Sequence, residues 1–184
     1  ASSFRLAFLA LEPAFGSMKH NLILAALKFY NVPEHMIKLI KSLYNECFVV
    51  VKTSKWITSP IQIQKGSLQG GPEAGVLFNI PWNLVIMGLF KFMLNLGYKR
   101  SEKPVSGFAD DLTVKTKVIL DMKRILQLAE GLCKWSRCLK FKQSKSAVLA
   151  LNQEGKIIDP KVELNGKKIP SLTSKPFKFI GKWI

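Results

Sequence analysis

Two adjacent aspartates, Asp110 and Asp111, are the side chains of this sequence best suited to chemistry, and the chain holds only four aspartates in all. On both sides of the pair, over residues 103–108 and 112–115, Val and Thr recur at alternating positions, which predicts two short strands joined by a tight hairpin. Carboxylates crowded at a hairpin tip repel each other unless a cation neutralises them, and Mg²⁺ prefers such hard oxygen ligands together with substrate phosphates. A solvated Asp-Asp turn is the alternative.

The charge balance predicts a polyanionic partner. The 184 residues include 28 Lys and Arg against 12 Asp and Glu, which gives a net charge of +16. Most of these cations are lysines, which suit sequence-independent contact with phosphates. Nucleic acid is therefore the expected partner, and a basic surface that only confers solubility is the alternative.

Other classes of protein are disfavoured by composition. Cys47, Cys133 and Cys138 are too few and too scattered for a disulfide framework, and no Cys and His spacing predicts a zinc site. The chain starts without a signal peptide, so we expect an intracellular protein, nuclear or cytoplasmic, that is not secreted. The apolar stretch 74–90 is interrupted by polar residues and by proline, and it falls short of the ~20 residues of a membrane span. We expect a buried helix there and no membrane.

Strand-like and helix-like patterns are mixed along the chain, which predicts the α+β class. We expect Ser17 to cap one helix and Pro33 to occupy the first position of the next. The remaining expected elements are a buried strand at 4–11, a hairpin with strands at 48–53 and 56–64, helices at 76–96 and 119–135, a strand at 147–151 and an Asn-Gly hairpin at 165–166. Pro81 falls inside the helix at 76–96, where it should produce a kink.

Three stretches in a fixed order carry a family resemblance. The aromatic-Ala-Asp-Asp run at 108–111 resembles motif C of reverse transcriptases, residues 65–79 resemble motif B, and residues 9–17 resemble a damaged motif A. Residues 139–146 and 177–181 are similar to motifs D and E. The closest resemblance is to reverse transcriptases of the non-LTR (LINE-type) retrotransposons and their group II intron relatives, which are RNA-directed DNA polymerases.

The resemblance also implies an architecture. It is that of a polymerase palm, an antiparallel sheet backed by helices, with part of the fingers and no thumb. Residues 1–20 and 61–184 would form the palm and residues 21–60 a fingers-side insertion, all within a single domain fragment of a longer polymerase.

The resemblance implies roles for individual residues in nucleotidyl transfer with two Mg²⁺ ions, an RNA template, a DNA primer or RNA–DNA hybrid, and dNTPs. Asp110 and Asp111 would be the catalytic metal ligands, and Lys145 of motif D would act near the leaving pyrophosphate as a candidate general acid. The implied nucleotide- and template-binding residues are Phe15, Lys65, Gly66, Gln69 and Gly70, and the implied primer grip comprises Phe179 and Gly181.

Motif A departs from the family pattern at its catalytic position. Alignment on Glu12 and Phe15 places Ala10 where the family has its metal-binding aspartate and Gly16 at the second aspartate, while Pro13 replaces a usual lysine. Alanine has no ligand atoms, so we expect weak metal binding and impaired or absent catalysis. Glu12 would face the same side of the strand as Ala10, but the family has glutamate there anyway, so nothing marks it as a replacement.

Two further interpretations follow from this departure. The chain could be a pseudo-polymerase that binds RNA or RNA–DNA hybrid without chemistry, or a decayed copy of a mobile element. The first predicts binding with steep salt dependence and no Mg²⁺-dependent extension. The second predicts a product that folds poorly.

Overall fold

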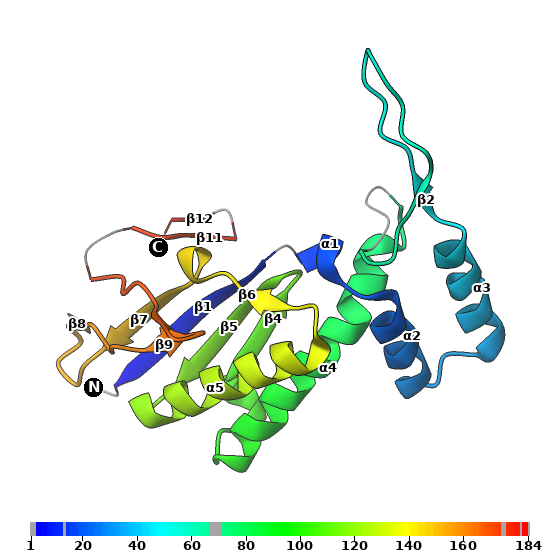
Figure 1. The fold of residues 1–184 in the computed structure, drawn as a ribbon. Helices are drawn as coiled ribbons and strands as arrows, with labels where there is room; N and C mark the ends of the chain where they lie inside the picture. Colours follow the sequence, from blue (N-terminus) through cyan, green and yellow to red (C-terminus); the bar gives the residue numbers. More distant parts are fainter. Residues whose placement is uncertain (1–2, 13, 67–70, 174–175, 181, 184) are drawn as a thin grey trace. The chain divides into compact units, whose positions relative to one another are not determined.

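The structure, a computed structural model, describes residues 3–12, 14–66, 71–173, 176–180, 182 and 183 (Figure 1). The chain forms two compact units, one made of Ala1–Pro13 with Asn83–Ile184 and one made of Ala14–Trp82. The sequence placed its boundaries instead after residues 20 and 60, and the assignment of these parts to palm and fingers stays a prediction.

The first unit is built on an antiparallel sheet in the order β4-β5-β1-β7-β8, with β6 also paired to β1 (Figure 1). The strand bounds are β1 Phe4–Glu12, β4 Val105–Phe108, β5 Asp111–Thr116, β6 Lys140–Phe141, β7 Ala147–Leu151 and β8 Ile157–Ile158. Residues 7–11 of β1 are buried, as a strand with neighbours on both edges and layers on both faces requires. The predicted strands at 4–11 and 147–151 and the predicted antiparallel α+β fold are confirmed.

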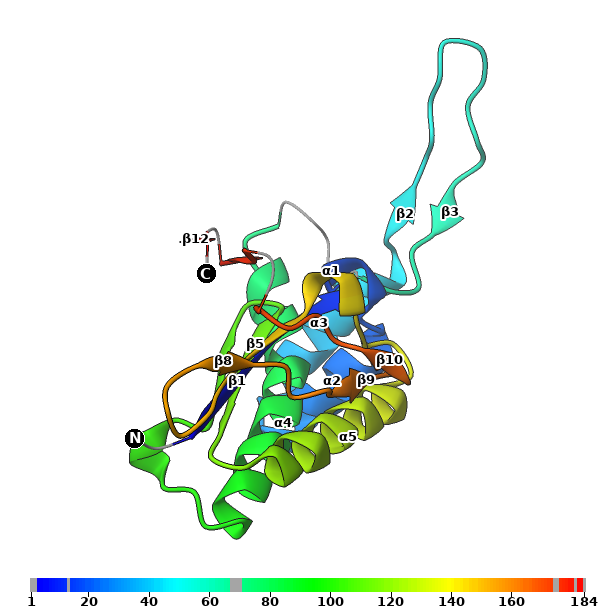
Figure 2. The same cartoon turned by 90° about the vertical axis from the view of Figure 1, so that its left-hand side faces the viewer.

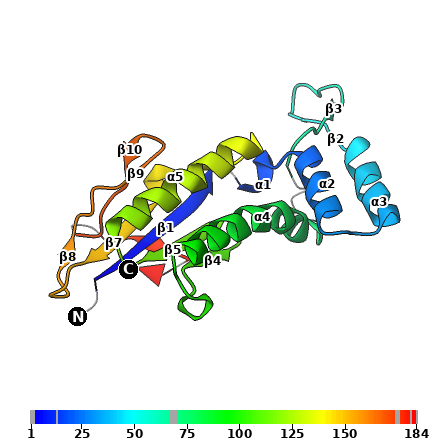
Figure 3. The same cartoon turned by 90° about the horizontal axis from the view of Figure 1, so that it is seen from below.

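Helices cover one face of this sheet. α5 (Ile119–Ser136) and the part of α4 (Ala74–Asn95) that belongs to this unit lie side by side across it (Figure 3). α5 buries one stripe, comprising Met122, Ile125, Leu126, Ala129 and Cys133, at the spacing of an amphipathic helix. A Cβ added to Gly88 of α4 would lie 3.3 Å from Leu132 Cδ1, so the absence of a side chain at Gly88 allows α4 to approach α5 closely.

The C-terminal part of the unit adds two small hairpins. β9 (Glu163–Leu164) pairs with β10 (Lys167–Lys168), and their hairpin lies beside α5 (Figure 2). Asn165 and Gly166 have φ values of 52° and 69°, as a two-residue type I′ turn requires, which confirms the predicted Asn-Gly hairpin. β11 (Lys178–Phe179) pairs with β12 (Lys182–Trp183).

The second unit contains α1 (Ala14–Ser17), α2 (His20–Phe29), α3 (Glu34–Asn45) and the strands β2 (Phe48–Val49) and β3 (Ile61–Gln62). Two sequence predictions were wrong here. Ser17 does not cap α2, because its hydroxyl donates backward to the Ala14 carbonyl at 3.2 Å and Lys19 occupies the N-cap position. Pro33 is the N-cap of α3 rather than its first helical residue.

The predicted hairpin at 48–64 is present, but its regular pairing is shorter than expected. β2 and β3 have two residues each, and Lys52 forms an isolated bridge with Ile57 nearer the tip. The ribbon exposes its apolar side chains, including Phe48, Val50 and Ile57. All four residues of β2 and β3 are exposed, and an isolated hairpin is marginally stable on its own.

α4 extends over 22 residues with Pro81 inside it, near the predicted helix at 76–96. By length and composition it could cross a membrane, a criterion that core helices of folded proteins also meet. Its buried positions within the described chain recur every three or four residues, at Ala74, Leu77, Phe78, Pro81, Trp82, Val85, Leu89 and Met93. The helix therefore buries one face rather than its whole surface.

Substitution on α5 tests the packing of the first unit. Ile125 is fully buried, whereas Leu120 on the same helix is 53% exposed. Ile125→Ala should lower the free energy of unfolding by about 2–5 kcal/mol, measured by urea denaturation. Leu120→Ala, which deletes a similar aliphatic side chain, should change it by no more than about 0.5 kcal/mol, and equal losses would contradict this packing.

Candidate active site

A tight hairpin presents the two aspartates. Phe108 of β4 pairs with Asp111 of β5, so Ala109 and Asp110 form a two-residue loop. Ala109 has a φ of 49°, and a positive φ at the first central residue is what such loops require. The predicted hairpin is present, although Asp111 is the first residue of the strand rather than part of the tip.

Ala10 lies directly beside this pair. In the β1–β5 ladder its Cα partner is Asp111, and the Leu11 N–H donates to the Asp110 carbonyl at 3.3 Å. A cavity of about 500 Å³ is lined by Ala10, Asp110, Asp111, residues 144–145 and residues 176–180. Ala10 of the motif A stretch and the two aspartates of the motif C stretch, which the family resemblance assigns to one site, are therefore adjacent in the fold.

The cavity changes the chemistry of Asp111. Burial raises the pKa of its carboxyl above the ordinary value, and the neighbouring Asp110 charge raises it further, whereas the Lys145 ammonium lowers it. A nearby negative charge and the removal of water on burial both disfavour the charged carboxylate form. A cation at this pair would relieve that cost.

Lys145 reaches the cavity from a short 3₁₀ turn, η2 (Gln143–Lys145), between β6 and β7. The Lys145 N–H donates to the Lys142 carbonyl at 3.1 Å, and the hydroxyl of buried Ser146 donates to the same carbonyl at 2.9 Å. Ser146, the partner of Lys145 in the Lys-Ser pair of motif D, thus anchors the turn. Lys145 itself is exposed.

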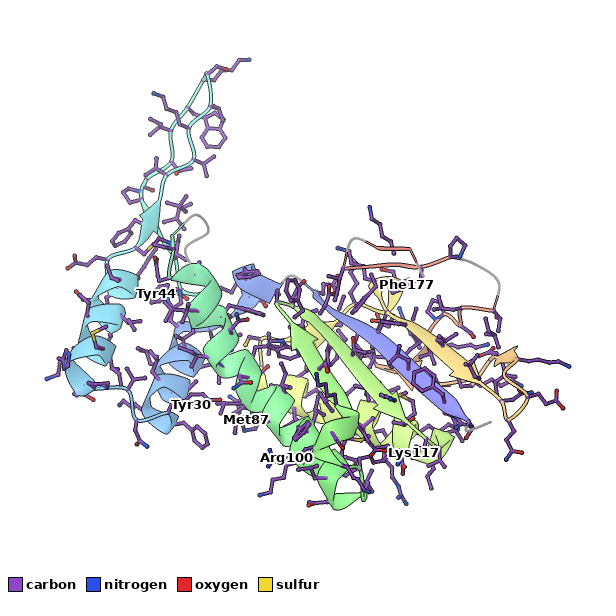
Figure 4. The ribbon with its side chains drawn as sticks, turned by 180° about the vertical axis from the view of Figure 1, so that it is seen from behind. Tyr30, Tyr44, Met87, Arg100, Lys117 and Phe177 are labelled. Atoms are coloured by element: carbon purple, nitrogen blue, oxygen red, sulfur yellow. The ribbon has the colours of Figure 1, made fainter. Side chains whose placement is uncertain are left out.

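The C-terminal segment closes another side of the cavity. Phe179 packs on Phe8 with ring centroids 4.7 Å apart, and Phe177 lies 6.0 Å from Phe8 in the segment beside the sheet (Figure 4). Phe8 and Ala10 share one face of β1, so these contacts hold the segment over that face. Phe177 and Lys178 line the cavity, yet sequence reasoning gave neither a role, although both lie in the stretch that resembles motif E. Gly181 lies outside the described residues.

Glu12 interacts with lysines outside the lining of this cavity. It pairs with Lys140 in the β1–β6 ladder, and its Oε1 lies 3.9 Å from Lys142 Nζ. Among the described residues, no cluster of three or more His, Cys, Asp or Glu side chains could hold a metal ion. Asp110 and Asp111 have the hard oxygen donors that suit Mg²⁺, and the facing methyl group of Ala10 adds none.

The nucleotide- and template-binding residues predicted from motifs A and B belong to the second unit. Phe15 stacks on Phe78 of α4 with centroids 4.6 Å apart. Lys65 pairs with Lys19 through the backbone, in an isolated antiparallel β-bridge. Gln69 and Gly70 lie outside the described residues. The structure therefore gives Phe15 a packing partner, and its predicted contact with a sugar stays a prediction.

Gly66, in the motif B stretch, forms hydrogen bonds with the segment that follows the motif A stretch. Its N–H donates to the Met18 carbonyl at 2.7 Å, and its own carbonyl lies 2.9 Å from His20 Nε2. It has a φ of +93°, and a Cβ there would lie 3.2 Å from Gly16 Cα. Both the conformation and the close approach require glycine.

The raised pKa of Asp111 predicts a pH dependence of stability. The folded chain binds more protons than the unfolded chain between the unfolded and folded pKa values, so the free energy of unfolding decreases as pH rises through this range. Asp111→Asn removes the charge and should make the chain more stable than the wild type at pH 7. This difference should vanish below about pH 3.5, where the unfolded carboxyl is also protonated. Urea denaturation at several pH values measures it.

Asp159 supplies a control of opposite sign. A hydrogen bond from Lys168 at 2.6 Å holds its pKa below the ordinary value, so its contribution is present above the unfolded pKa and is lost as pH falls through the folded pKa. Asp159→Asn should leave stability at pH 7 unchanged or slightly lower. A loss of stability at pH 7 in Asp111→Asn would mean that Asp111 is stabilised by a partner.

Comparisons with known proteins agree with this geometry. A model of the family "Reverse transcriptase (RNA-dependent DNA polymerase)" matches residues 2–184. A curated relative, "Transposon TX1 uncharacterized 149 kDa protein" of Xenopus laevis, is 27% identical over 129 residues, or 68% of this chain. The chain spans about 10% of that relative's length.

A solved structure shows the same fold. Apo telomerase from Candida tropicalis, truncated from its C-terminal domain, aligns with a TM-score of 0.64 at 13% identity, over 95% of this chain and 35% of the telomerase chain. The likeness at this identity concerns the fold alone, and it confirms the predicted palm-type polymerase architecture. Because the family model covers nearly every residue, this chain belongs to the reverse transcriptase family, as its resemblance to LINE-type enzymes predicted.

Proposed function

We propose that this chain is the palm of an RNA-templated DNA polymerase whose nucleotidyl transfer is impaired at motif A. The observation that supports this most directly is the pairing of Ala10 with Asp111 at the edge of a cavity that both residues line. A carboxylate at position 10 would project toward the other two, whereas the alanine methyl group has no ligand atom.

Asp110 and Asp111 would hold the divalent cations, which supply charge neutralisation for the attacking and leaving oxygens when bound. With two carboxylates instead of three, water has to complete the coordination, which Mg²⁺ tolerates at a cost in affinity. The burial and like charge that raise the pKa of Asp111 support cation binding at this pair.

The remaining proposed roles follow the family pattern. Lys145 is in the same cavity, where its ammonium would stabilise or protonate the leaving pyrophosphate. Phe179, fixed against Phe8, would contribute with Gly181 to a primer grip. Phe15, Lys65, Gly66, Gln69 and Gly70 would contact the dNTP and the RNA template. With these partners, the proposed location is inside the cell, in the nucleus or cytoplasm.

A non-catalytic binder of RNA or RNA–DNA hybrid is the second candidate. The net charge of +16 favours it, because phosphate neutralisation by lysines needs no metal and produces steep salt dependence. A mobile-element relic is the third possibility, and a sharp cooperative melt of the purified chain would count against it.

Restoration of motif A tests the proposal. In the full-length protein, Ala10→Asp with Gly16→Asp should increase Mg²⁺-dependent primer extension on an RNA template by at least about 100-fold. Metal stabilisation of the transition state is worth several kcal/mol. A side chain at position 16 has room, because a Cβ there meets nothing within 4 Å.

The matched control is Ala10→Asn with Gly16→Asp, which adds a side chain of the same volume at position 10 without its negative charge and should not restore extension. Comparable extension by the wild type and the restored protein would show that the empty ligand position does not limit catalysis. No extension by the restored protein would instead favour the non-catalytic binder.

Metal affinity can be measured without catalysis. Mg²⁺ should raise the Tm of the Ala10→Asp variant more than that of the wild type, since a tenfold gain in affinity adds about 1.4 kcal/mol of stabilisation at saturating ion. Asp111→Asn should abolish the shift in either background, and Ala10→Asn should behave as the wild type. Equal Mg²⁺ shifts in the wild type and Ala10→Asp would contradict the assignment of Ala10.

A further inference from the structure

The second unit carries an exposed ribbon that the proposed catalytic roles do not use. We call residues 48–62 the arm; it runs out from the end of α3 as two adjacent chain segments (Figure 1 and Figure 2). Between Glu46 and Glu73 the sequence holds three lysines, Lys52, Lys55 and Lys65, and no acidic residue. The arm is therefore a purely cationic element.

Hydrogen bonds fix the tip of the arm. The Thr53 N–H donates to the Trp56 carbonyl at 2.9 Å, and the Thr53 hydroxyl oxygen accepts from the N–H groups of Lys55 and Trp56 at 3.2 and 3.1 Å. Farther from the tip, the Thr58 N–H donates to the Val51 carbonyl at 3.0 Å, and the Val51 N–H donates to the Thr58 hydroxyl at 3.0 Å. The backbone that carries Trp56 is thus preorganised rather than a loose loop.

This fixed backbone presents an exposed aromatic ring. Trp56 is 55% exposed near the tip, between Lys55 and Ile57, which are exposed too. Arm side chains project outward from both chain segments (Figure 4). A large exposed aromatic residue on a backbone held by hydrogen bonds is a candidate contact surface, and a ring that is 55% exposed is accessible to a flat partner.

We propose that the arm binds single-stranded nucleic acid, with a base stacked on Trp56 and phosphates contacted by Lys52 and Lys55. Exposed aromatics combined with positive charge are how proteins bind single strands without sequence preference. A base can stack on the ring only when it has left its own helical stack, so a single strand fits and a continuous duplex does not. A second copy of the chain fits less well, because two arms would bring four lysines together without a compensating carboxylate.

The proposal is independent of metal binding and of catalysis at Asp110 and Asp111. It shares with the proposed function only the class of partner. Binding measured in EDTA without dNTPs therefore tests the arm, while primer extension tests the active site, and either can fail without the other.

The test is fluorescence anisotropy of a labelled single-stranded RNA of about 12 nucleotides, within the range of such sites. Trp56→Ala should weaken binding by about tenfold or more, and Trp56→Phe, which keeps a stacking ring, should recover most of the affinity. Trp135→Ala is the matched control, because Trp135 is 65% exposed in the first unit. It should leave the affinity unchanged.

The lysines are tested by salt dependence. The double variant Lys52→Gln, Lys55→Gln should reduce the slope of log affinity against log salt by about 1.4, since each neutralised phosphate of a single strand contributes about 0.7. The double variant Lys38→Gln, Lys41→Gln removes the same charge from exposed positions of α3 and should leave the slope unchanged.

Three results would overturn the proposal. One is an equal loss of affinity in Trp56→Ala and Trp135→Ala. Another is a preference of the arm for duplex over single-stranded RNA that Trp56→Ala abolishes. The third is a dimer in sedimentation that Trp56→Ala dissociates while RNA affinity stays the same, which would make the arm an interface between copies of the chain.

Discussion

The pairing of β1 with β5 is the constraint on which the chemistry of the first unit depends. Leu9 and Leu112 are opposite each other in this ladder, and both are completely buried. A slip of β1 by one residue would turn Leu9 to the opposite face while Leu112 stayed in place, so the burial of both leucines locks the register. Ala10 and Asp111 are the next pair along, and their position at the cavity follows from the packing of their apolar neighbours.

The identity of the residue at this fixed position affects the electrostatics of the cavity. The cavity holds Asp110 and Asp111 together with Lys145 and Lys178, so its formal charges nearly cancel. A third carboxylate at position 10 would make the cavity an anionic site that attracts divalent cations. Without it, the lysines can attract phosphates while the attraction for Mg²⁺ is reduced.

Most elements of the fold followed from local pattern, and the failures had tertiary or competing local causes. Alternating Val and Thr predicted the hairpin that bears Asp110, and Asn165 with Gly166 predicted a type I′ turn that the φ values confirm. Ser17 is not an N-cap because its hydroxyl donates a hydrogen bond to the Ala14 carbonyl instead. The regular strands of the arm are shorter than predicted, because both are exposed and an isolated hairpin is marginally stable on its own.

By itself, the sequence determined the family, the class of fold and the position of the carboxylate pair on a hairpin, because these depend on residue types in a fixed order. That Ala10 leaves a metal-ligand position empty stays a prediction of the motif A alignment. Only the tertiary structure decided which groups share the cavity. It placed Lys178 and Asp111, more than sixty positions apart in the sequence, in the lining of one cavity, and it placed Glu12 beside Lys142. It also raised the pKa of Asp111 through burial. Distances between remote segments and the loss of water around a charge arise only when the chain packs, so no local pattern can contain them.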